Sequence, residues 1–343
     1  MVTIQPLSLD LKSKLQQKID AKTKPLGSLG MLERVALKIG LIQNSLTPKL
    51  EQPTIIIFAG DHGIAREGVS PYPQAITYQM VLNFLTGGAA INVFCRQNGL
   101  AIKVVDAGVN HEFEPHPDLI EAKIGQETGN YLHEPAMTAA QCQTALNKGA
   151  EIIADLHQSG CNIVGFGDMG ISNTSSAAIL MSLLIGIPLE RCVGRGTGLD
   201  EGGLQKKTYI LKQAVQNRAI DPLPMTVLET FGGFEIAMMC GAMLKAAELD
   251  IILLVDGFIS TTAMLVTSKL NKEVLDYAIF AHQSNERGHQ QLLNYLEAEP
   301  LLKLNMRLGQ GSGAALAYPL VQSAISFLNE MASFESIEVS NRK

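Results

Sequence analysis

The sequence predicts an α/β fold built on a mostly parallel, doubly wound sheet. About five short apolar segments with the length of buried strands alternate with longer segments of helical periodicity. Several of these strands are followed directly by Asp and Gly or by a glycine-rich loop. Because the carboxyl ends of parallel strands lie along one edge of a sheet, the loops predict a single ligand-binding crevice in a Rossmann-like domain.

The composition argues against several classes of protein. The 343 residues carry a formal net charge of −6 without a basic stripe, so no nucleic-acid partner is expected. The most apolar long stretch, 251–266, is interrupted by Asp256 and is too short to cross a bilayer, so no membrane partner is expected either. The N-terminus lacks the apolar core of a signal peptide, and five scattered cysteines indicate free thiols in a cytoplasmic protein. Seven histidines without ligand-like spacing indicate no metal site.

The two ends of the chain predict a smaller helical subdomain. Residues 7–22 and 31–43 can each form an amphipathic helix, and neither end of the chain contains a strand pattern. We therefore expect a helical subdomain formed by 1–50 together with about 300–343. The remaining segment, 51–299, is expected to form the α/β domain that binds a nucleotide and a base.

Strands and helices alternate along the central region. The expected strands are short and β-branched or aliphatic, and they are Thr54–Phe58, Ala101–Val105, Cys161–Val164, Ile251–Val255 and Tyr277–Ala281. The expected helices from here to the end of the chain are Gln74–Leu85, Ala89–Gln97, Thr138–Gln158, Ala177–Leu184, Leu204–Gln216, Gly232–Leu249 and Ala314–Leu328.

The stretch Gly165–Ala178 (GFGDMGISNTSSAA) is the strongest candidate for an anion site. It is expected as a strand, a glycine turn and a helix, the geometry in which backbone N–H groups point toward an anion. Asn173 to Ser176 add side-chain hydrogen-bonding groups at the helix start. A capped helix after a tight turn is an equally good interpretation of this stretch alone.

The same stretch also fits G-x-G-x-x-G, so an NAD-dependent oxidoreductase has to be considered. That class would place an acidic residue about twenty positions further on, after a second strand. Glu190 lies near that distance, but it follows Ile-Pro-Leu and not a clear strand. The dehydrogenase is therefore the weaker alternative.

Other loops suggest a nucleotide-like ligand. A second glycine-rich segment, 194–203, leads into a helix that would carry Lys206 and Lys207 in its first turn, where cations are favourable only beside an anion. Tyr72 and Gln79 could line a flat pocket for a planar ring, although ordinary helix packing would explain them as well. Spacing alone does not name the reaction.

Six segments resemble, in order, the nicotinate-nucleotide–dimethylbenzimidazole phosphoribosyltransferase family. They are TKPLGSLG (23–30), AGDHGIAREGVSPYPQ (59–74), GDMGISNT (167–174), GRGTGLDEGGLQKK (194–207), VDGFISTTA (255–263) and RLGQGSGAALA (307–317). The resemblance implies an α/β homodimer without a metal or redox cofactor. It implies transfer of phosphoribosyl from nicotinate mononucleotide to 5,6-dimethylbenzimidazole or a related base.

The resemblance also implies roles for individual residues. The group expected to bind phosphate and ribose is Gly170, Ile171, Ser172, Asn173, Thr174, Ser175, Ser176, Gly202, Gly203, Lys206, Lys207, Asp256 and Ser284. The group expected to bind the base is Ser70, Tyr72, Gln79, Met169 and Leu308. In the family a Glu in the late glycine loop removes the N–H proton of the incoming base.

Two positions depart from the family pattern. GEMG is here GDMG with Asp168, and GEGSG is here GQGSG with Gln310 at the position of the general base. A Gln amide can hold the N–H of a heterocycle but cannot accept its proton. Three interpretations follow: an engineered Glu→Gln variant, a natural relative that uses Asp168 or water as base, or a nucleotide- and base-binding protein without catalysis.

Overall fold

The computed structural model, which describes residues 3–218 and 221–337, confirms the α/β fold. All neighbouring strands of its sheet run parallel, in the order β3-β2-β1-β4-β5-β6. The strands are β1 Thr54–Gly60, β2 Ala101–Gly108, β3 Leu119–Glu121, β4 Ile163–Met169, β5 Ile252–Val255 and β6 Ala278–Phe280. This order is that of a doubly wound sheet, whose direction of winding reverses between β1 and β4.

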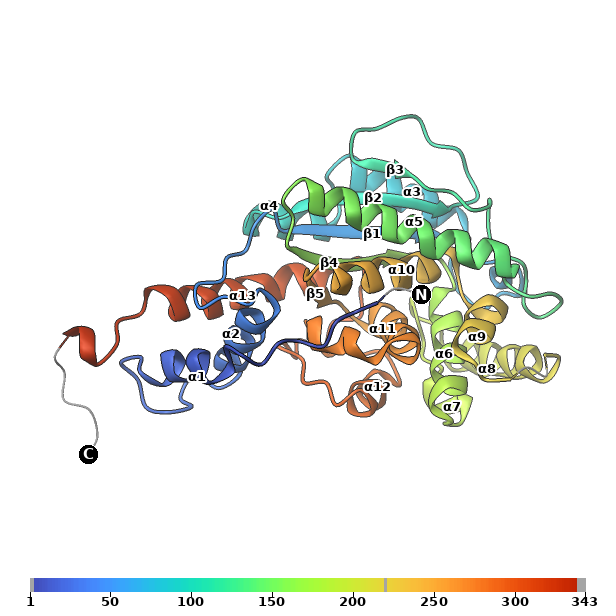
Figure 1. The fold of residues 1–343 in the computed structure, drawn as a ribbon. Helices are drawn as coiled ribbons and strands as arrows, with labels where there is room; N and C mark the ends of the chain where they lie inside the picture. The colour runs from blue at the N-terminus through green and yellow to red at the C-terminus, as the bar shows by residue number, and fades with distance from the viewer. Residues whose placement is uncertain (1–2, 219–220, 338–343) are drawn as a thin grey trace.

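Helices cover both faces of the sheet (Figure 1). On one face, helix α10 contacts β1, β2, β4 and β5, and the long helix α5 packs on α10. Helices α3 and α4 lie behind the sheet in the same view. The helices are α1 Lys12–Asp20, α2 Met31–Ile42, α3 Ala75–Leu85, α4 Ala90–Asn98, α5 Ala139–Gln158, α6 Asn173–Ile185, α7 Leu189–Cys192, α8 Glu201–Gln216, α9 Pro224–Phe231, α10 Phe234–Glu248, α11 Phe258–Leu270, α12 His289–Tyr295 and α13 Ser312–Glu330.

The prediction of a glycine turn at Gly165 and Gly167 is wrong, because β4 continues through both residues to Met169. A Cβ atom on Gly165 would collide with the Ile55 side chain, and one on Gly167 would lie 2.5 Å from the carbonyl carbon of Gln310. These two glycines therefore allow distant segments to approach the sheet. The turn itself is confined to 170–172, and α6 begins four residues earlier than predicted, at Asn173.

Several other boundaries differ from the predictions. The three-residue strand β3 was not predicted, nor were α7, α9, α11 and α12. Residues 258–262, which were not assigned to a helix, form the start of α11. Helix α8 begins at Glu201 and is capped by Asp200, so Lys206 and Lys207 lie beyond its first turn and do not oppose the helix dipole as predicted.

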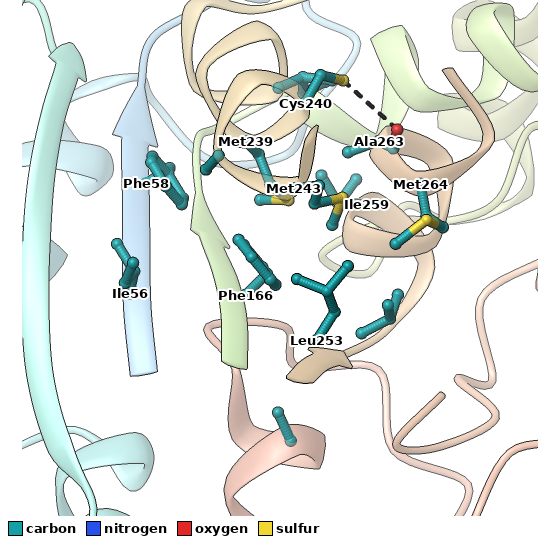
Figure 2. Close-up of a cluster of buried hydrophobic side chains, with 14 of the residues drawn as sticks. Ile56, Phe58, Phe166, Met239, Cys240, Met243, Leu253, Ile259, Ala263 and Met264 are labelled. Atoms are coloured by element: carbon teal, nitrogen blue, oxygen red, sulfur yellow. Dashed lines mark hydrogen bonds between the residues drawn. The ribbon is translucent and has the colours of Figure 1, made fainter. Parts of the chain in front are cut away.

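The core lies between the sheet and the helices α10 and α11 (Figure 2). The rings of Phe58 on β1 and Phe166 on β4 lie side by side, with centroids 6.5 Å apart and planes within 8°. Met243 of α10 packs over this pair, and the Cys240 thiol donates a hydrogen bond to the Ala263 carbonyl oxygen of α11 at 3.4 Å. Each such apolar side chain contributes ~1.5–3 kcal/mol by leaving water, so this layer fixes the sheet that carries the strand ends.

The proposed helical subdomain is only partly described, since 1–2 and 338–343 lie outside the described residues. In the described part, α1 packs on α2, and α2 packs on α13. Helix α13 also contacts α4 and β4, which links these helices to the sheet. Whether the terminal segments form a separate subdomain stays a prediction. Among the described residues, no helix has both the length and the apolar character needed to span a bilayer.

We predict that Gly149→Ala lowers the free energy of unfolding. A Cβ atom there would overlap the Met238 carbonyl oxygen of α10, so α5 and α10 would have to separate, at a cost of ~1–3 kcal/mol. Chemical denaturation measures the change. Gly202→Ala is the matched control, because its new methyl group would lie 3.8 Å from the nearest atom, within a helix that alanine favours. Equal stability of the Gly149 variant and the wild type would contradict the packing described.

Candidate functional site

A cavity of about 630 Å³ lies at the carboxyl edge of the sheet. Its walls come from the residues that follow β4, β5 and β6, from the loop around 196, and from the segment that precedes α13. The predicted site residues that line it are Tyr72, Asp168, Met169, Gly170, Ile171, Asn173, Thr174, Ser284, Leu308 and Gln310. The crevice predicted from the strand ends is therefore present.

Among the residues that the structure describes, Asp168 is one of two carboxylate residues that line the cavity, the other being Glu286. The Asp168 side chain is 7% exposed, and Oδ2 accepts a hydrogen bond from the Asn173 amide at 2.9 Å. Burial and the nearby Asp256 charge raise the pKa of Asp168 to about 7. A carboxyl with this pKa can both accept and release a proton near neutral pH.

Gln310 lies in a turn that projects toward the same cavity. Gly309, Gln310 and Gly311 all have left-handed backbones, with φ of 77°, 66° and 81°. A non-glycine residue there is strained by about 1–2 kcal/mol, and such strain often occurs at functional sites. A Cβ on Gly309 would lie 3.4 Å from Asp168 Oδ1, so this turn is adjacent to the Asp168 carboxylate.

Asp256 does not line the cavity but supports the Gln310 turn. Its two carboxylate oxygens accept hydrogen bonds from the backbone N–H groups of Gly311 (3.2 Å) and Ala314 (2.9 Å) at the start of α13. Burial raises its pKa, and these hydrogen bonds and His282 oppose that rise. Because both oxygens are already engaged, the carboxylate is held by the protein and not directed into the cavity.

The start of α6 forms the polar wall predicted for phosphate. Gly170, Ile171, Asn173 and Thr174 line the cavity there. The buried Lys207 ammonium donates a hydrogen bond to Thr174 Oγ1 at 2.9 Å, behind this wall. Burial lowers the pKa of Lys207 to about 8, and the nearby Glu286 charge opposes the shift. An anion at this wall would lie at the positive end of the α6 dipole, with the Lys207 ammonium behind Thr174, while the N–H groups of Asn173 and Ser175 already donate to backbone carbonyl oxygens.

Part of the cavity lining is apolar. Tyr72, Met169 and Leu308, predicted to bind a base, lie there with Ile76, Met80 and Met306. Tyr72 and Leu308 are half exposed, so the cavity is open to solvent beside these two residues. Two other residues predicted to bind a base do not line the cavity. The Ser70 hydroxyl lies 3.4 Å from Oγ1 of the lining residue Thr197, and Gln79 is exposed on α3.

The remaining residues of the predicted phosphate group lie outside the lining. Ser172, Ser175 and Ser176 are buried, and Ser176 Oγ lies 3.1 Å from His62 Nδ1. Gly202 and Gly203 form the first turn of α8, where the Gly203 N–H donates to Asp200 Oδ1, and Lys206 is exposed. The ligand roles expected of these residues stay predictions.

Four lining residues with polar side chains were not predicted, and they are Thr197, His282, Glu286 and Arg307. The Gly196 N–H donates to Glu286 Oε1 at 3.0 Å, while the Gly196 carbonyl accepts from Arg307 at 2.8 Å. The position of His282 directly after a strand was a usable signal. Arg307 begins the segment 307–317 that resembles the family, which was also a usable signal, whereas Glu286 lies in none of the six segments and only the fold brings it to the loop around 196. Within 3–218 and 221–337 no group of three or more His, Cys, Asp or Glu residues could hold a metal ion.

Comparisons with known proteins agree on one family. A family model described as phosphoribosyltransferase matches residues 4–339. The chain is 57% identical to the nicotinate-nucleotide–dimethylbenzimidazole phosphoribosyltransferase of Dechloromonas aromatica, covering 97% of each chain. It is 53% identical to the Aromatoleum aromaticum protein of the same name, over 97% of this chain and 96% of the relative. A crystal structure of CobT from Thermus thermophilus superposes with a TM-score of 0.93 at 39% identity, covering 97% of this chain and all of that one.

We predict that Asp168→Asn stabilises the protein in a pH-dependent way. The folded-state pKa of about 7 lies above the ordinary value of 3.8, so the wild type loses stability as pH rises from about 4 to about 7. The variant lacks this ionisation, and its advantage should grow from near zero at about pH 4 to ~2–4 kcal/mol at about pH 8. Urea denaturation at both pH values measures it, with exposed Asp155→Asn as the control. An advantage that does not change with pH would show that Asp168 is not desolvated.

Proposed function

The chain belongs to the phosphoribosyltransferase family whose model matches residues 4–339. From this we propose that it transfers a 5-phosphoribosyl group from nicotinate mononucleotide to 5,6-dimethylbenzimidazole or a related base. The products would be nicotinate and α-ribazole phosphate. Nothing in the comparisons supports the NAD-dependent oxidoreductase alternative. The segment that suggested it contains Gly165 and Gly167, which are strand residues.

The observation that supports the proposal is a cavity whose lining combines the start of α6, a group of apolar side chains and the Asp168 carboxylate. A volume of about 630 Å³ lies in the range of small-molecule sites and would admit a mononucleotide beside a planar ring. The start of α6 suits the phosphate, and Lys207 behind Thr174 adds positive charge. The apolar side chains of the lining, Tyr72 and Leu308 among them, suit the flat base.

The reaction requires little covalent chemistry from the protein. The bond between ribose C1′ and the pyridine nitrogen breaks, and its electron pair neutralises the positive charge of that nitrogen, so nicotinate is a good leaving group. The ribose passes through a state resembling an oxocarbenium ion, as in glycoside chemistry. A ring nitrogen of the base forms the new bond to C1′. Holding both reactants in line supplies much of the rate enhancement.

Asp168 is the group that we assign to the final proton transfer. Once one ring nitrogen has bonded to C1′, the base carries a positive charge and its remaining N–H becomes much more acidic. A modest base then suffices, and a carboxylate with a pKa of about 7 is suited to accept this proton at neutral pH. The Gln310 amide oxygen can accept a hydrogen bond from the same N–H and orient the ring, without taking the proton.

The assembly and location of the protein are further parts of this proposal. We propose a homodimer, which the family resemblance supports. We also propose that it acts in the cytoplasm on small molecules, which is supported by the five buried cysteines, none of them in a disulfide within the described residues. No metal or redox cofactor enters the proposed reaction.

We predict that Asp168→Asn lowers kcat at least ~100-fold, because the amide cannot accept the proton. The wild-type kcat should rise with pH as Asp168 loses its proton and level off above about pH 7, whereas the variant should show no such rise. Release of nicotinate from nicotinate mononucleotide, with dimethylbenzimidazole present, measures both. Asp168→Glu, which restores the residue of the family pattern, is the control expected to retain activity. Unchanged rates in Asp168→Asn would reject Asp168 as the base.

We predict that Gln310→Glu raises kcat at least ~10-fold by placing a second carboxylate beside the ring. The same change in the Asp168→Asn background should restore transfer, since the new Glu replaces the missing base. A variant no faster than the wild type would mean that position 310 does not meet the base. Stabilisation by nicotinate mononucleotide without nicotinate release, in the wild type and in Gln310→Glu alike, would indicate a binding protein without catalysis.

A further inference from the structure

A charged pair is buried one layer beneath the polar wall of the cavity. His62 Nε2 and Glu235 Oε1 are 2.6 Å apart, and both side chains are fully buried. His62 follows β1, Glu235 lies in the first turn of α10, and 173 residues separate them in sequence. Neither side chain lines the cavity, so neither can touch a ligand there.

The fold leaves space for this pair by using glycine. A Cβ on Gly60 would lie 2.9 Å from Glu235 Oε2, and a Cβ on Gly233 would overlap both the Glu235 carboxylate and the His62 ring. A Cβ on Gly170, in the wall itself, would lie 3.5 Å from Glu235 Oε1. Three separate segments therefore lack side chains where they surround this carboxylate, and the pair lies directly against the turn between β4 and α6.

The other nitrogen of His62 connects the pair to that turn. Nδ1 lies 3.1 Å from Ser176 Oγ, in the first turn of α6. Burial by itself lowers the pKa of His62, whereas the charge and hydrogen bond of Glu235, together with the charges of Asp61 and Asp168, raise it, and the net shift is upward. Ser176 Oγ also lies within hydrogen-bond distance of the Gly232 carbonyl oxygen (3.4 Å) and of the Tyr131 hydroxyl (3.5 Å), so the imidazole and these two groups together hold the Ser176 side chain.

Stability alone does not account for such a pair. Two desolvated charges gain little over apolar side chains of the same volume, and replacing them with such side chains often stabilises a protein. Buried ion pairs can, however, fix one arrangement of the elements that they join. Here those elements are β1, α10 and the start of α6.

We propose that His62 and Glu235 are positioning residues, which act through Ser176 to hold the first turn of α6 where it faces the phosphate of the bound mononucleotide. This inference rests on the proposed function, because it takes the ligand from it. It predicts that the pair supports binding of the phosphate and contributes little to binding of the rest of the nucleotide.

The test compares two ligands that differ only in the phosphate: nicotinate mononucleotide and nicotinate riboside. Calorimetry gives Kd for both with the wild type, Ser176→Ala and Glu235→Gln. Each variant should bind the mononucleotide roughly tenfold more weakly, a change of the size produced by losing one well-placed hydrogen bond, and the riboside less than about twofold more weakly.

Ser182→Ala is the matched control. Ser182 lies further along α6, and its hydroxyl donates to the Ile187 carbonyl oxygen at 2.7 Å, so the control loses a comparable hydrogen bond away from the turn. It should lower thermal stability and leave both Kd values within about twofold. If Glu235→Gln does not fold, the smaller change Ser176→Ala decides the question.

Equal weakening of both ligands in Ser176→Ala, or no weakening of either, would overturn the inference. The same loss of mononucleotide affinity in Ser182→Ala would also overturn it, since the effect would then be one of stability. Binding of the mononucleotide without any transfer would contradict the proposed function and leave this comparison intact. No binding of the mononucleotide by the wild type would overturn both.

Discussion

The Asp256 carboxylate at the start of α13 is the interaction on which the arrangement of the cavity depends. It accepts hydrogen bonds from Gly311 and Ala314 and thereby fixes a turn of three successive left-handed residues. The turn then packs against Gly167 of β4, where a side chain would leave no room. Gln310 and Asp168 become neighbours as a result, although 142 positions separate their residue numbers (310 minus 168).

Buried charge is concentrated around this edge of the sheet. Asp168, Asp256 and Glu235 are all nearly or fully buried, with His62 and His282 among them. Desolvation and the neighbouring negative charges keep the pKa of Asp168 near neutrality. The other two carboxylates have partners within the protein: Asp256 accepts hydrogen bonds from the start of α13, and Glu235 pairs with His62. A Gln at position 310 adds no further negative charge to this group. The same electrostatics thus supports both the Asp168 role and the tolerance of an amide next to it.

The sequence predicts the sheet well because its strands are short, apolar and bounded by glycine or Asp. It also predicts that the crevice lies at the strand ends, since parallel topology leaves few alternatives. It does not show that Gly165 and Gly167 serve packing, because their partners, Ile55 and Gln310, are far away in the chain. Strand β3 escapes prediction because three residues carry no periodicity. The burial of Lys207, the capping by Asp256 and the pairing of His62 with Glu235 likewise depend on tertiary contacts.

A crystal structure with 5,6-dimethylbenzimidazole and nicotinate mononucleotide bound tests the central claim most directly. The account predicts the phosphate at the first turn of α6 and the flat ring between Tyr72 and Leu308. It further predicts a ring nitrogen within hydrogen-bond distance of the Asp168 carboxylate or of the Gln310 amide. A heterocycle bound elsewhere, with Asp168 and Gln310 touching neither reactant, would contradict it.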